Sequence, residues 1–83
     1  MSLVKLGRAR LCLALPRHRE QLRSTKNPAL YDLFESYALA AQTLDNLLRE
    51  RPRREALVAE YRSLCLDLQA EIVSFLIHIH NAG

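Results

Sequence analysis

The apolar residues between positions 28 and 50 recur at the spacing of an amphipathic helix. They follow one another at steps of three and four, the heptad spacing of helices that pack along one seam. The members are Leu30, Phe34, Tyr37, Ala41, Leu44 and Leu48, with a second ridge of Leu33, Ala40 and Leu47 beside them. Asn27 followed by Pro28 predicts the start of this helix, because asparagine caps free N–H groups and proline at the first helical position loses no hydrogen bond.

A second long helix is expected from about residue 53 to residue 80. Pro52 ends the first helix, because a proline ring is incompatible with a helix interior. The expected seam of the second helix is Leu57, Tyr61, Leu64, Leu68, Ile72, Phe75 or Leu76, and Ile79. Since the connection is short, the pattern predicts an all-α fold built on an antiparallel two-helix hairpin.

The second helix carries an additional apolar stripe that the hairpin cannot cover. Its members are Leu66, Ala70, Val73 and Ile77, which recur at steps of four, three and four. Two facing helices bury one seam each, so this stripe requires a second copy of the chain, another protein or the folded-back N-terminal segment. We therefore expect a helical bundle, formed either by a homodimer or by a complex with a different protein.

Residues 1–26 differ in character and are interpreted as a basic N-terminal arm, joined to a body of residues 27–83. Residues 1–27 carry seven Lys or Arg against one Glu, whereas residues 28–83 carry five Arg against eight acidic side chains. The stretch from Leu11 to Leu15 alternates like a strand, and Gly7 interrupts any longer helix. We expect partial order at most, with a short third helix near residues 16–24.

The charge of the arm raises an alternative function. Arginines on a mobile segment can bind phosphates or an acidic protein surface. The candidates are Arg8, Arg10, Arg17, Arg19 and Arg23. The arm contains no aromatic residue for base stacking, so direct binding of nucleic acid is the secondary hypothesis, beside a generic helical adaptor.

Catalytic chemistry is not indicated by the residue pattern. No nucleophile–base set or glycine-rich phosphate loop can be assembled, and Cys12 and Cys65 lack the spacing of metal ligands. We expect no enzyme, no cofactor and no metal. Low cysteine content favours a reducing cytoplasm, and the sequence has no apolar run long enough to span a membrane.

The body also resembles a known family. The segment LDNLLRERP, residues 44–52, and the segment LDLQAEI, residues 66–72, together with Tyr61, resemble the two-helix body of TraM- and QseM-type antiactivators of LuxR-family quorum-sensing regulators. The resemblance covers residues 28–80. The turn is shorter here than in that family, and the basic arm has no counterpart in it.

The resemblance implies a cytoplasmic, dimer-forming antiactivator that binds a LuxR-type (TraR-like) transcription factor and keeps it from DNA. By position, it makes Tyr61 and the stretch around Gln69 candidates for contact with the partner. Leu66, Val73 and Ile77 join them from the apolar periodicity instead, and the same stripe could serve as the dimer seam.

Overall fold

The protein is built entirely of helices over the part of the chain that its structure describes. The structure is a computed structural model that describes residues 2–82, with side chains through residue 79. In chain order the elements are α1 (Leu3–Ala14), the 3-10 turn η1 (Pro16–His18), α2 (Arg19–Ser24), α3 (Pro28–Arg49) and α4 (Glu55–Ala82). The predicted all-α class is thus confirmed.

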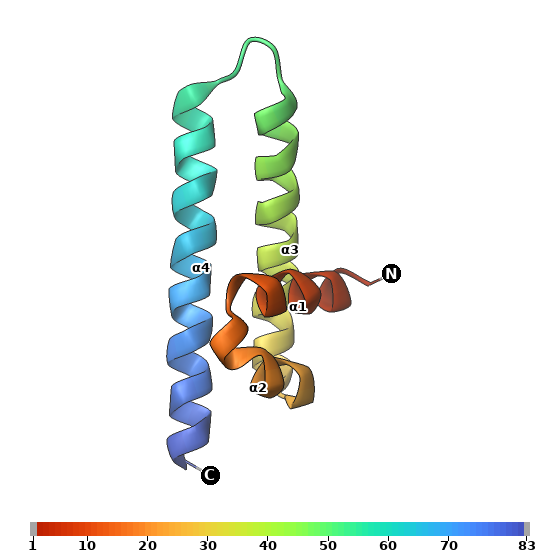
Figure 1. Cartoon of the computed structure of the whole chain (residues 1–83), viewed down its shortest axis with the longest axis vertical. Coiled ribbons are helices and arrows are strands. Elements are labelled where there is room, and N and C mark those ends of the chain that lie inside the picture. Colours follow the sequence, from red (N-terminus) through yellow and green to blue (C-terminus); the bar gives the residue numbers. More distant parts are fainter. Residues whose placement is uncertain (1, 83) are drawn as a thin grey trace.

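The two long helices lie side by side and run in opposite directions (Figure 1). The Asn27 side chain accepts a hydrogen bond of 2.9 Å from the Ala29 N–H, so the predicted cap is present at the start of α3. Helix α3 ends at Arg49, and residues 50–54 lead into α4. In this exposed turn, the hydrogen bond donated by Arg54 lowers the pKa of the Glu50 carboxyl.

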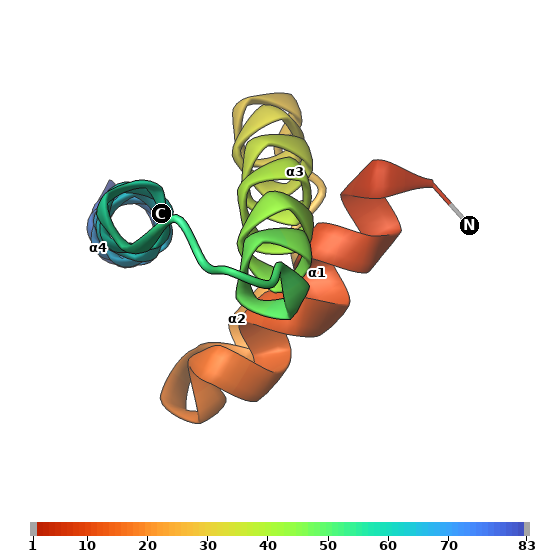
Figure 2. The same ribbon diagram turned by 90° about the horizontal axis from the view of Figure 1, so that it is seen from above.

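The N-terminal segment is more ordered than we expected. Residues 3–14 and 19–24 are helical, and α1 and α2 cover one face of the α3–α4 pair (Figures 1 and 2). Leu11 and Leu22 are completely buried in the main hydrophobic core. The expectation of partial order was wrong because it weighed only the local pattern, whereas the surface of α3 supplies the apolar partner that the segment lacks on its own.

Gly7 has a role opposite to the one its sequence suggested. It lies inside α1 and is buried where α1 crosses α3. A Cβ atom built at this position would lie only 1.8 Å from the Phe34 carbonyl oxygen, so no other residue allows the two backbones to approach this closely. The glycine does not interrupt the helix; it permits α1 to pack on α3.

In the N-terminal half of α4 the buried positions come one residue after the expected seam, whereas Ile72 and Leu76 are buried as expected. Val58 and Cys65 are buried, whereas Leu57 is half-buried and Leu64 is 43% exposed. Val58, Cys65 and Ile72 are spaced by seven residues, which keeps them in line along the contact with α3. Sequence reasoning chose the larger leucines, but the small Cys65 is the residue that fits between the helices.

Candidate protein-binding groove

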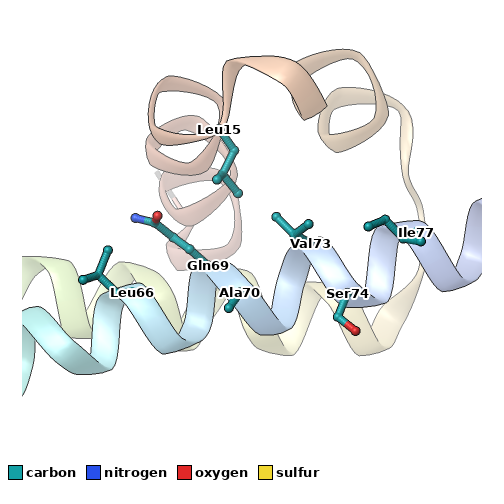
Figure 3. Close-up of a pocket in the computed structure, with 7 residues that line it drawn as sticks. All are labelled: Leu15, Leu66, Gln69, Ala70, Val73, Ser74 and Ile77. Carbon is teal, nitrogen blue, oxygen red and sulfur yellow. The ribbon is translucent and has the colours of Figure 1, made fainter.

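An apolar groove runs along α4 beside the N-terminal helices. Its volume is about 540 Å³, and its lining residues are Leu15, Leu66, Gln69, Ala70, Val73, Ser74 and Ile77. Six of them come from α4, and Leu15 follows the last residue of α1. Figure 3 shows Leu15 pointing toward α4 above Gln69 and Val73.

The geometry of α4 explains why this stripe remains open. Each of Leu66 and Val73 follows a residue that faces α3, namely Cys65 and Ile72. One residue along an α-helix turns the side chain by about 100°, so the stripe points away from α3. Leu66 stays 60% exposed and Ile77 51% exposed.

The N-terminal helices cover this stripe only in part. Leu15 forms the opposite wall of the groove. The Gln21 side chain donates a hydrogen bond of 2.9 Å to the Leu76 carbonyl oxygen, which ties α2 to the C-terminal half of α4. The folded-back N-terminal segment was one of three candidates for covering the stripe, beside a second copy of the chain and another protein. It contributes one wall and leaves the groove open.

The groove gathers four of the five candidate contact residues and leaves out the fifth. Leu66, Gln69, Val73 and Ile77 line it together. Tyr61 lies instead beside Leu64 in a separate depression of about 290 Å³ between α3 and α4.

Gln69 has a structural partner of its own. Its amide N–H donates a hydrogen bond of 2.8 Å to the Tyr37 hydroxyl, which links α4 to α3. Sequence reasoning missed Leu15 as a wall of the groove; its position directly before Pro16, where the helix must end, was the available signal.

The five candidate arginines of the N-terminal segment do not form one solvated set. Arg10 forms an ion pair of 2.9 Å with Asp45 on α3. Arg8 donates a hydrogen bond of 3.2 Å to the Thr25 carbonyl oxygen, and Arg19 donates one of 3.4 Å to the Cys12 carbonyl oxygen. Arg17 and Arg23 are exposed, and the part of the chain that the structure describes offers them no such partner.

The two cysteines lie inside the fold. Both cysteines are buried free thiols, and desolvation by burial raises the pKa of the Cys65 thiol. Within the described residues, no three His, Cys, Asp or Glu side chains lie close enough to hold a metal ion. Among the same residues, no helix is long and apolar enough to cross a membrane.

No family model, no curated protein and no solved structure matches the chain.

Proposed function

We propose that this protein is a non-enzymatic regulator that binds another protein through the groove on α4. The observation that supports this function is the exposure of Leu66 and Ile77 on either side of a half-buried Val73. Exposed apolar side chains gathered in one groove are typical of protein-binding surfaces, whereas scattered ones are not. Leu15 on one side and α4 on the other form the groove before any partner binds, so little free energy is spent on ordering it.

The shape of the groove suits an amphipathic helix of the partner. The apolar contacts recur along α4 at the spacing of helical turns, so a partner helix could place its own apolar side chains between them. Gln69 lies among these contacts and offers its side-chain carbonyl oxygen as an acceptor, since its amide N–H already binds Tyr37. This polar group would fix the position of the partner.

The partner that we propose is a LuxR-type transcription factor. The resemblance of residues 28–80 to TraM- and QseM-type antiactivators supports this choice of partner, and the groove provides a surface of suitable chemistry. Binding would take place in the cytoplasm and would keep the regulator from DNA. The competing use of the same surface is a homodimer in which two copies of α4 bury their stripes against each other.

The test is co-purification with the LuxR-type regulator of the same organism, together with the regulator's affinity for its DNA site. The double variant Leu66→Asp/Ile77→Asp should weaken the complex by at least about a hundredfold, because it places charges in the centre of an apolar contact. The protein should remain folded by circular dichroism, since both side chains are largely exposed.

Leu39→Asp is the matched control. Leu39 is 48% exposed on α3 and lies outside the groove, in the depression that Tyr61 also lines, so this variant should bind as the natural protein does if the groove alone contacts the regulator. A folded double variant that still captures the regulator would rule out the groove as the contact. Light scattering at low and high protein concentration separates the homodimer, because only self-association makes the measured mass depend on concentration.

A further inference from the structure

A second cavity lies between α1 and α2, and basic side chains surround it. Its volume is about 510 Å³, and it shares no residue with the groove on α4. The lining residues are Lys5, Arg8, Ala9, Cys12, Leu13, Arg19 and Arg23. None of these seven described residues is acidic, so the cations around the cavity have no counter-charge in its wall.

The basic residues are spaced so that neighbouring positive charges on each helix repel each other. Lys5 and Arg8 are three residues apart on α1, and Arg19 and Arg23 are four apart on α2. Residues at these spacings are neighbours on a helix surface, and like charges placed there destabilise the helix. An anion bound in the cavity would relieve both repulsions at once.

Two of the arginines make contacts within the fold before any ligand arrives. The Arg8 guanidinium lies over the rings of Tyr31 and Phe34, at 5.5 Å and 5.4 Å from their centroids, and donates a hydrogen bond to Thr25. Its Nε atom is buried and has no hydrogen-bond partner among the described residues. Arg19 is exposed and donates a hydrogen bond of 3.4 Å to the Cys12 carbonyl oxygen, so Arg8 is the side chain that loses least freedom on binding.

The wall of the cavity is apolar between the charges. Ala9, Cys12 and Leu13 form it, and Leu13 is 80% exposed, the most exposed large apolar side chain among the described residues. An inorganic anion would leave this leucine in water. A ligand that fits all seven residues therefore carries an apolar group as well as negative charges.

We propose that this cavity binds an acidic peptide segment of a partner protein, in which one apolar side chain is flanked by carboxylates. The apolar side chain would pack on Leu13 and Ala9, and the carboxylates would pair with the surrounding cations. Nucleic acid fits less well, because no aromatic side chain lines the cavity for base stacking and a phosphodiester backbone gains nothing from Leu13.

The test uses the full chain and a fluorescein-labelled helical peptide of about 15 residues, with one leucine flanked by glutamates on the same face. Fluorescence anisotropy should detect binding that weakens as salt is added. Replacing the glutamates by glutamine, or the leucine by alanine, should each weaken binding by about tenfold or more. A labelled DNA duplex of similar length serves as the phosphate probe.

A pair of charge-matched variants locates the site. Lys5→Gln/Arg23→Gln removes two exposed cations from the cavity rim, and Arg17→Gln/Arg49→Gln removes two exposed cations outside it. The first double variant should weaken peptide binding by about tenfold, and the second should change it by less than about twofold. Neither variant is expected to unfold the protein, because all four side chains are exposed.

Each contrary result would overturn the proposal. Equal weakening by both double variants would show attraction to net charge alone. DNA binding that matches or exceeds peptide binding, with no effect of the leucine, would assign the cations to nucleic acid. Absence of peptide binding at low salt would leave the cavity without this role. Lys5→Gln/Arg23→Gln leaves every residue of the groove on α4 unchanged, so its effect on peptide binding is distinguishable from a failure of the proposed antiactivator function.

Discussion

The two long helices differ in how many neighbours cover them. Helix α3 packs against α4 through Tyr37 and Ala40 and against α1 at Phe34 and Asp45. Seven of its residues are buried. Helix α4 is the longer and equally apolar, yet among its described side chains only Val58, Cys65, Ile72 and Leu76 are buried.

This difference shows that apolar content alone does not decide which helix forms the core. The central helix buries side chains on two sides because it has two neighbours, and the outer helix buries one side because it has one along most of its length. The surplus apolar surface of α4 becomes the groove. The binding function proposed above rests on this surplus surface.

The largest effect is expected from the same substitution made on each helix. Leu30→Ala on α3 should lower the free energy of unfolding by about 3 kcal/mol, because Leu30 is completely buried and its removal leaves a cavity. Leu66→Ala on α4 should cost less than about 0.5 kcal/mol, because that side chain is already in water. Urea unfolding followed by circular dichroism measures both.

Equal losses of unfolding free energy in Leu30→Ala and Leu66→Ala would contradict the difference between α3 and α4. That result would mean that Leu66 is covered in solution, as it would be in a homodimer. Repeating the measurement at a tenfold lower protein concentration would then distinguish the dimer, since its stability falls on dilution.

A smaller effect is expected at the contact between α1 and α3. Gly7→Ala should destabilise the protein by about 2 kcal/mol, because the new methyl group would collide with the Phe34 carbonyl oxygen in the backbone of α3. Helix propensity alone predicts the opposite sign, a stabilisation of about 1 kcal/mol. The sign of the change in thermal unfolding therefore decides whether α1 packs closely on α3.

Ala9→Gly is the control on the same helix. Ala9 is exposed, so this variant should lose only the helix propensity of alanine, about 1 kcal/mol. If Gly7→Ala stabilises the protein, the N-terminal segment behaves as the partly ordered arm that its sequence suggested.

The smallest expected effect is on the reactivity of Cys65, on the side of α4 that faces α3. Burial raises the pKa of the Cys65 thiol, an effect that the Arg10 guanidinium opposes and the Asp45 carboxylate adds to. Alkylation of Cys65 by iodoacetamide, measured in a Cys12→Ser background, should therefore require a higher pH in the folded protein than in urea.

The same shift has a consequence for stability. Since the thiol ionises more readily in the unfolded chain, the contribution of Cys65 is fully present below the unfolded thiol's pKa and is lost as the pH rises through the folded value. Identical alkylation profiles in the folded and unfolded protein would show that Cys65 is not desolvated, and so that α4 is not held against α3 at this point.

Much of the long-helix architecture could be predicted from local chemistry. The Asn27 cap and Pro28 set the start of α3, and the expected bounds of both helices agree with the structure within two residues. The placement of α1 could not be predicted in the same way. Its strand-like stretch becomes helical because Leu11 is buried in the core, a contact between segments distant in sequence.

The candidate site shows the same division. Periodicity identified Leu66, Val73 and Ile77 as a stripe that α3 does not cover, and the structure places all three in one groove. Periodicity could not predict that Leu15 forms the facing wall of the groove. It also could not show that Tyr61 lies outside the groove. Both facts depend on how α1 and α4 are placed relative to α3, which no local pattern encodes.

The sequence by itself determined that this chain forms long helices, where they begin, and that α4 carries more apolar surface than one neighbour can bury, because caps and heptad spacing act within a few turns. Only the tertiary structure decided that Gly7 is a contact point, that Cys65 rather than Leu64 faces α3, and that Lys5, Arg8, Arg19 and Arg23 surround one cavity. The physical reason is that close packing chooses among equally apolar positions by how well their side chains fit the neighbouring helix. That fit is defined only when the helices are packed together.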